Sequence, residues 1–111
     1  MWIATKVGFF SIVRKEEKDF HVRARLRPDL VEMMELTGIE SKIFESEYTD
    51  YRFRIVVDSD TVRKIGAILF QEIDYDNFKN TIHDSSTQRE KYETYGNIWS
   101  LMWGLQEGEK I

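Results

Sequence analysis

Arginines recur at every second position in two short segments of the chain. In residues 20–27, Phe20, Val22, Ala24 and Leu26 alternate with His21, Arg23, Arg25 and Arg27. In residues 51–57, Tyr51, Phe53, Ile55 and Val57 alternate with polar positions that include Arg52 and Arg54. Successive side chains of a strand point to opposite faces, so each segment predicts a strand with one core face and one cationic face. Guanidinium groups donate paired hydrogen bonds to carboxylate or phosphate oxygens, and the two strands together would present a platform for an acidic partner.

A purely structural explanation for these arginines stays open. Glu45 and Glu47 share one face of a further predicted strand, residues 42–48. They could neutralise two arginines as ordinary cross-strand pairs, and exposed charges also protect a sheet from unwanted association. The remaining arginines exceed this local supply of carboxylates. We therefore predict a non-enzymatic binding module, with the cationic face as its site.

The partner of this face is predicted from charge and from the aromatic residues. The formal net charge is −4, but residues 1–27 carry seven Lys or Arg against three acids, and residues 28–111 carry nine against seventeen. Sheet-based readers of single-stranded nucleic acid stack bases on exposed aromatic rings, whereas the alternation here sends most aromatic residues inward. An acidic protein surface is accordingly our first candidate, and nucleic acid is the alternative.

Other residue patterns that could carry chemistry are weak. Cysteine is absent, which excludes thiolate metal sites and Cys nucleophiles. Asp58 and Asp60 follow an apolar strand as in aspartate-dependent phosphotransferases, but the chain has no room for the parallel sheet that this reaction needs, so helix capping is the better explanation. His21 and His83 lie far apart in the sequence. We predict no catalytic residue, metal or cofactor.

A small enzyme with a polar anion pocket is kept as a second alternative. The connection at residues 74–79 contains Asp74, Tyr75, Asn77 and Lys79. Asn77 and Lys79 would complete a polar pocket if they met Arg23 and Arg25 in space.

The spacing of apolar residues predicts the elements that position these side chains. Two hairpins are expected, the first from residues 7–15 and 20–27 and the second from residues 42–48 and 51–58. A helix follows each hairpin, one from Pro28 to Gly38 and one after residues 58–60. The fold class is α+β, with a four-stranded antiparallel sheet built from two ββα units and helices on one face. We expect one domain over residues 1–111.

An aromatic C-terminal helix is predicted after a capping box at residues 87–90. Its aromatic residues occupy more helical faces than a single core stripe needs. Part of the surface is therefore predicted to contact a second copy or another partner, and a homodimer is one outcome. The candidate self-association residues are Tyr95, Trp99, Met102 and Trp103.

The sequence predicts a cytoplasmic location, since it shows no basic leader followed by an apolar run and no membrane-spanning stretch. Three motifs, Gly8-Phe9-Phe10-Ser11, Val22-Arg23-Ala24-Arg25 and Asp74-Tyr75-Asp76-Asn77-Phe78-Lys79, occur together with Tyr95, Ile98 and Trp99. In these motifs the chain resembles a group of short, uncharacterised bacterial and phage-associated proteins. The resemblance suggests a provenance and implies no activity.

Overall fold

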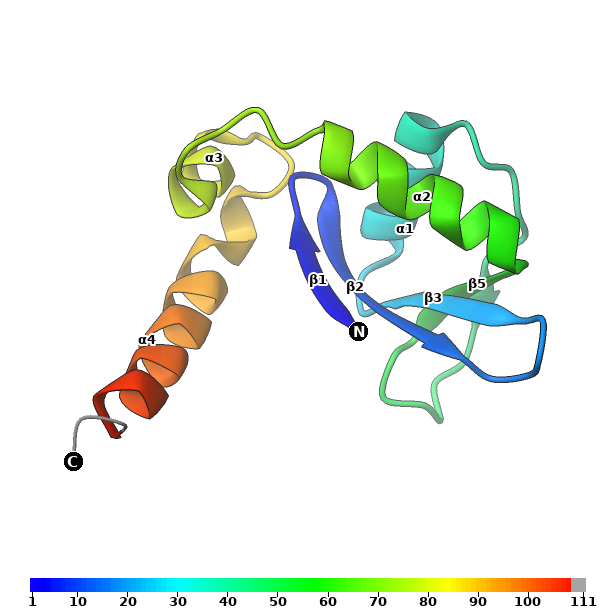
Figure 1. Ribbon diagram of the computed structural model, residues 1–111, viewed down its shortest axis with the longest axis horizontal. Coiled ribbons are helices and arrows are strands. Elements are labelled where there is room, and N and C mark those ends of the chain that lie inside the picture. Colours follow the sequence, from blue (N-terminus) through cyan, green and yellow to red (C-terminus); the bar gives the residue numbers. More distant parts are fainter. Residues whose placement is uncertain (109–111) are drawn as a thin grey trace. The chain divides into compact units, whose positions relative to one another are not determined.

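The computed structural model describes residues 1–108, and the chain divides into two compact units, Met1–Asp74 and Tyr75–Ile111. The first unit contains all the strands and the helices α1 and α2, and the second contains α3, a short 3-10 helix and α4 (Figure 1). The α+β class is therefore confirmed. The expectation of one domain over the whole chain stays a prediction.

The first unit holds a five-stranded antiparallel sheet with the strand order β1-β2-β3-β5-β4. The prediction of four strands was wrong, because a strand at residues 2–5 was missed. In the tight turn that follows this strand, the Thr5 hydroxyl accepts hydrogen bonds from the backbone N–H groups of Val7 and Gly8 at 3.2 and 3.1 Å. The first predicted ββα unit is thus three strands followed by a helix. The strands are β1 (Trp2–Thr5), β2 (Gly8–Arg14), β3 (Phe20–Ala24), β4 (Phe44–Glu45) and β5 (Phe53–Val57).

The strand β3 ends at Ala24, earlier than the alternating pattern predicts, and α1 (Arg27–Thr37) begins almost at once. Pro28 fits the first turn of this helix because its missing N–H would have no partner there. Arg25 therefore follows the strand, and Arg27 is the first residue of the helix. The predicted end of α1 is confirmed, since Gly38 has φ 72° and its N–H donates to the Met34 carbonyl at 2.9 Å.

The helices α1 and α2 (Ser59–Gln71) lie on the same side of the sheet (Figure 1), as predicted. Asp58 begins α2 as its N-cap, with Oδ1 accepting from the Thr61 N–H at 2.8 Å. The core forms between these helices and the covered sheet face. Its buried residues are Val7, Phe10, Val22, Ala24, Leu30, Met33, Ile55, Val57, Ile65 and Leu69.

One contact between a side chain and the backbone holds α1 against the start of β2. Asp29 is 3% exposed, and its Oδ2 accepts from the Phe9 N–H at 3.2 Å. A Cβ atom added at Gly8 would lie 2.6 Å from Cβ of Asp29. Only glycine permits this approach, and the first turn of α1 is thereby held on the sheet.

The second unit contains α3 (Phe78–Asp84), η1 (Arg89–Lys91) and α4 (Tyr92–Gly108). The expected connection at residues 74–84 is partly helical, and the predicted capping box at 87–90 lies in a turn and η1, so the aromatic helix begins at Tyr92. Among residues 75–108, the buried residues of the second unit are Ile82, Gln88 and Tyr95. Tyr95 packs against Phe78 with ring centroids 5.2 Å apart. No helix of residues 1–108 combines the length and the apolar character needed to cross a bilayer.

Candidate anion-binding face

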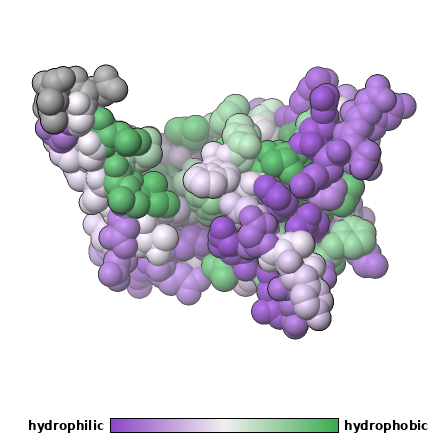
Figure 2. Space-filling view, turned by 90° about the horizontal axis from the view of Figure 1, so that it is seen from below, coloured by the Kyte–Doolittle hydropathy of each residue, from purple (hydrophilic) through white to green (hydrophobic). Residues whose placement is uncertain are grey.

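The sheet face opposite α1 and α2 carries no helix of the first unit, and we call it the free face. Val22, Ala24, Ile55 and Val57 are buried on the helix side, so the predicted register of β3 and β5 is confirmed. Arg23 and Arg54 consequently project from the free face and are partly buried there. Figure 2 views the molecule from below the strands of Figure 1, and there hydrophilic residues gather next to residues of intermediate hydropathy. This face is the candidate site.

Arg23 and Arg54 stand directly opposite each other in the antiparallel pair of β3 and β5. Like charges in this position destabilise a sheet. Among residues 1–108, no carboxylate oxygen lies within 4.0 Å of a side-chain nitrogen of Arg23, Arg25 or Arg54. The structural explanation of these three arginines as members of ion pairs therefore fails.

Neutral groups hold Arg23 in place. Its Nη2 donates to Oγ of Ser11 at 2.7 Å, and its guanidinium lies 4.7 Å from the centre of the Tyr51 ring. Its Nε is buried and has no hydrogen-bond partner among the residues that the structure describes. A buried donor without an acceptor costs stability. The chain thus keeps this cation in a fixed and incompletely satisfied position.

Arg25 is held in a similar way at the end of β3. Its Nη1 donates to the Asp50 carbonyl at 2.6 Å, and its guanidinium lies 4.3 Å from the centre of the Tyr51 ring. Tyr51 is 3% exposed, but it lies outside the hydrophobic cluster of the core. Tyr51 is therefore buried, as predicted, but it packs under charged side chains and not in the main core. Because β5 begins only at Phe53, the alternation does not extend to Tyr51, and two cations cover its ring.

Arg54 contacts the only histidine of this face. Its Nη1 lies 3.3 Å from Nδ1 of His21, and its Nη2 donates to the Tyr51 carbonyl at 3.4 Å. Burial lowers the pKa of His21 from its usual 6.5, and the positive charges of Arg54, Lys15 and Arg23 lower it further, against an opposing effect of Asp19. Neutral His21 can accept the hydrogen bond from Arg54, whereas its protonated form cannot.

Arg52 differs from these three arginines because its charge is neutralised within the chain. Its Nε lies 2.8 Å from Oε1 of Glu45, and its Nη2 lies 4.0 Å from Oε1 of Glu47. The sequence-based alternative of local ion pairs therefore holds for this residue. Arg27 is exposed at the start of α1 and belongs to no strand. The cluster of candidate residues is reduced to Arg23, Arg25 and Arg54.

The residues proposed from the connection have local roles in the structure. Asn77 is the N-cap of α3, where its Oδ1 accepts from the Asn80 N–H at 2.9 Å, and Lys79 lies over the Trp99 ring at 4.6 Å. Asp74 pairs with Lys6 at 3.0 Å, and Tyr75 packs against Phe78. A joint pocket of Asn77 and Lys79 with Arg23 and Arg25 stays a prediction.

The remaining candidate acids and histidines serve the helices. The hydrogen bonds from Thr61 lower the pKa of Asp58, in keeping with its capping role. His83 Nδ1 lies 3.1 Å from Oδ1 of Asp84, and both side chains are exposed on α3. No group of three His, Cys, Asp or Glu residues in the described part of the chain has the geometry to hold a metal ion.

The sequence analysis did not place Trp2 or Phe44 on the free face. Trp2 is 75% exposed and its ring lies 6.4 Å from that of Phe9, while Phe44 pairs across the strands with Arg54. Trp2 was missed because β1 has only four residues, too few for a clear alternation. Aromatic rings thus accompany the arginines on this face.

Comparison of the chain with protein-family models, with curated proteins and with solved structures found no match. The resemblance to short bacterial and phage-associated proteins stays a prediction.

Proposed function

We propose that the chain is a non-enzymatic binding module whose free face holds an acidic segment of another protein. Arg23, Arg25 and Arg54 would bind its carboxylates. The observation that carries the proposal is the cross-strand pair of Arg23 and Arg54 without a carboxylate partner. An acidic ligand would relieve the repulsion between the two cations and form charge-assisted hydrogen bonds with them.

The three guanidinium groups are well prepared for such a ligand. Each has five N–H donors, and neutral acceptors such as Ser11 Oγ and the carbonyl groups of Asp50 and Tyr51 occupy only part of them. The Tyr51 ring further restrains two of the three side chains. Binding would therefore cost little side-chain entropy, which is the main reason that preorganised sites bind tightly.

A protein partner fits this face better than a nucleic acid. Tyr51 is covered by two guanidinium groups and offers no open ring for base stacking, which leaves Trp2 and Phe44 as exposed rings at the margins of the arginine cluster. The absence of cysteine is consistent with a role in the cytoplasm, which we propose as the location.

A pair of matched variants tests the proposal with an oligoglutamate peptide as the probe. We expect calorimetric titration to show binding that Arg54→Gln weakens at least about tenfold, because hydrogen bonds to charged groups contribute roughly 1.5–3 kcal/mol. Arg52→Gln is the control, since this neighbouring arginine is already paired with Glu45. Equal losses in the two variants, or no binding of the peptide at low salt, would refute the proposal.

A titration with single-stranded DNA separates the alternative partner. Phosphate contacts release counterions, so binding of nucleic acid falls steeply as salt rises. We expect the oligonucleotide to bind more weakly than oligoglutamate at equal ionic strength. Tighter binding of the oligonucleotide, with loss of affinity in Arg54→Gln, would move the proposal to nucleic acid recognition.

A further inference from the structure

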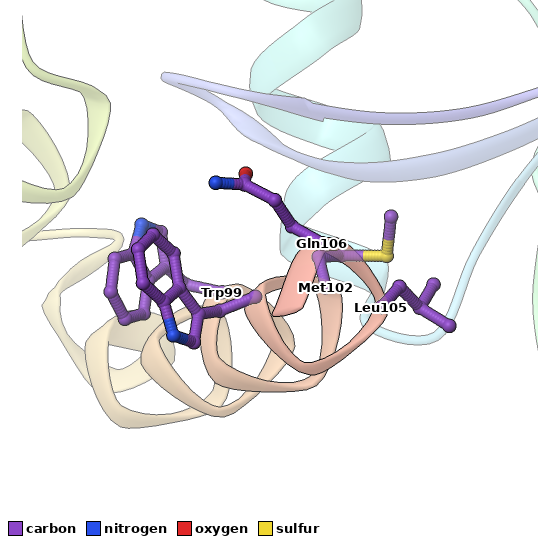
Figure 3. A pocket seen from close by; sticks show the side chains of 5 residues that line it. Trp99, Met102, Leu105 and Gln106 are labelled. Atoms are coloured by element: carbon purple, nitrogen blue, oxygen red, sulfur yellow. The ribbon is translucent and has the colours of Figure 1, made fainter. Parts of the chain in front are cut away.

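The helix α4 presents an apolar surface that is much larger than its contacts within the second unit require. Six of its large apolar side chains are between 42% and 74% exposed, namely Ile98, Trp99, Leu101, Met102, Trp103 and Leu105. Figure 2 shows hydrophobic residues gathered over this helix, at the left of the view. Figure 3 shows Met102 and Leu105 projecting from the last turns of this helix, with the Trp99 indole farther along the helix at the left of the view.

Within this surface, four residues form a stripe of helical spacing. Ile98, Leu101, Met102 and Leu105 follow each other at positions i, i+3, i+4 and i+7, so they lie on one side of the helix. The buried contact of α4 is made by a different residue, Tyr95, which packs on Phe78. The stripe is thus a second apolar side of the same helix.

We infer that this stripe pairs with the same stripe of a second copy, so that two α4 helices cross about a two-fold axis near Leu101 and Met102. A symmetric dimer brings one surface against itself and needs no second kind of surface. The inference is independent of the proposed function, because the arginines of the free face take no part in it.

The exposed area agrees with what a stable dimer buries. The four side chains of the stripe are 42% to 74% exposed, and with the half-exposed Trp99 and Trp103 beside them, aromatic residues of a type that buries roughly 150–250 Å² each, they offer several hundred Å². A standard interface buries about 800 Å² per partner, and the largest apolar patch of a typical monomer is about 300–600 Å². The α4 surface is therefore comparable to the largest apolar patches of monomers, which are often functional, and a dimer would bury it together with the polar surface around it.

Charge identifies a second copy as the occupant. From Thr94 to Gln106 the helix has no Asp, Glu, Lys or Arg. A charged partner would find no complementary group on the stripe itself, since Lys79 lies over Trp99, whereas a second copy brings an equally neutral and apolar stripe. Its docking would avoid the repulsion that two chains of net charge −4 experience elsewhere.

Sedimentation equilibrium of the full chain tests the dimer. We expect a mass twice the 13.3 kDa of the chain, and a double variant Leu101→Lys/Leu105→Lys that associates at least about tenfold more weakly while its circular dichroism is unchanged. Phe70→Lys is the matched control, because Phe70 is 61% exposed on α2, comparable to Leu105 at 66%. A monomeric wild-type chain, or equal weakening by the control, would overturn the inference.

A cross-linking experiment covers the case in which the double variant does not fold. The chain has no cysteine, so Leu101→Cys introduces a single thiol next to the inferred axis. Mild oxidation should link this variant into a dimer quickly, and Phe70→Cys should not react at a comparable rate. Equal rates for the two variants would overturn the paired arrangement of α4.

Discussion

The two units of the chain solve the problem of apolar surface in opposite ways. In the first unit, ten buried residues from three strands, two helices and the turn after β1 form one cluster, and the free face of the sheet carries charge. In the second unit, Ile82 and Tyr95 are the buried apolar residues, while most of the large apolar side chains of α4 are exposed. Among the described residues, the first unit thus buries most of its large apolar side chains in one core, and the second leaves most of those of α4 exposed.

This difference separates two kinds of interaction surface. Polar contacts such as those of Arg23 and Arg54 contribute orientation and rapid encounter, whereas apolar surface contributes most of the affinity. A transient acidic partner on the free face and a lasting contact through α4 are therefore compatible within one chain.

The largest expected effect is the removal of a core side chain from the first unit. Phe10 is fully buried, and Phe10→Ala should lower the free energy of unfolding by about 3–5 kcal/mol. Leu105→Ala removes a side chain that is 66% exposed and should change the unfolding of the isolated chain at low concentration far less. Denaturant titration measures both. Similar losses of unfolding free energy in the two variants would show that Leu105 belongs to a closed core and would contradict this difference between the two units.

A smaller effect is expected within the second unit, from the lysine over Trp99. Lys79→Ala should lower the stability of this unit by about 0.5–1 kcal/mol and change the tryptophan emission, since Nζ lies 4.6 Å from the ring centre. Lys79→Arg should retain most of the stability. Lys42→Ala is a control from the first unit, where Nζ lies 4.9 Å from the exposed ring of Phe44. An unchanged emission in Lys79→Ala would contradict this contact.

The smallest effect concerns the pH dependence of the first unit. The pKa of His21 is lowered in the folded chain, so the unfolded chain takes up this proton first as the pH falls below 6.5. The free energy of unfolding should decrease over that range and level off below the lowered pKa. The wild-type chain should therefore lose more stability than His21→Gln between pH 7 and pH 5. The opposite sign would place an unrecognised acid beside His21.

Oligoglutamate should reverse this shift if it binds at the proposed site. A carboxylate beside Arg54 and Arg23 offsets the positive charges that disfavour protonation, so the pKa of His21 should rise on binding. A nuclear magnetic resonance titration of the His21 ring measures it. His83, on α3 of the second unit, provides an internal reference in the same spectrum.

The sequence predicts the central part of the first unit well, because the alternation of apolar and polar residues over β3 and β5 determines which side chains are buried in the core. Val22 and Ile55 are buried on the face that the helices cover, and Arg23 and Arg54 lie on the opposite, free face, as a period of two requires. The alternation fails at the ends of these strands. It cannot show that Pro28 and α1 end β3 at Ala24, or that Tyr51 lies under two guanidinium groups.

The candidate site is only partly predictable for a related reason. Which arginine meets a carboxylate depends on strand order and on the turn at residues 46–52, and neither is encoded in local spacing. Glu45 pairs with Arg52 rather than with Arg54 because the partner of Arg54 on β4 is Phe44. Fold class follows from periodicity, whereas pairing across strands depends on the completed sheet.

The adjacency of β3 and β5 also determines when the cationic site comes into existence. Arg23 and Arg54 can become neighbours only after α1 and β4, which separate them in the sequence, have been synthesised. A chain emerging from the ribosome would expose the first arginine long before the second, and no pair would form until Phe53–Val57 had docked. The arginine pair on which the proposed binding of an acidic ligand depends therefore forms late in folding, and a fragment that stops before β5 would lack this pair altogether.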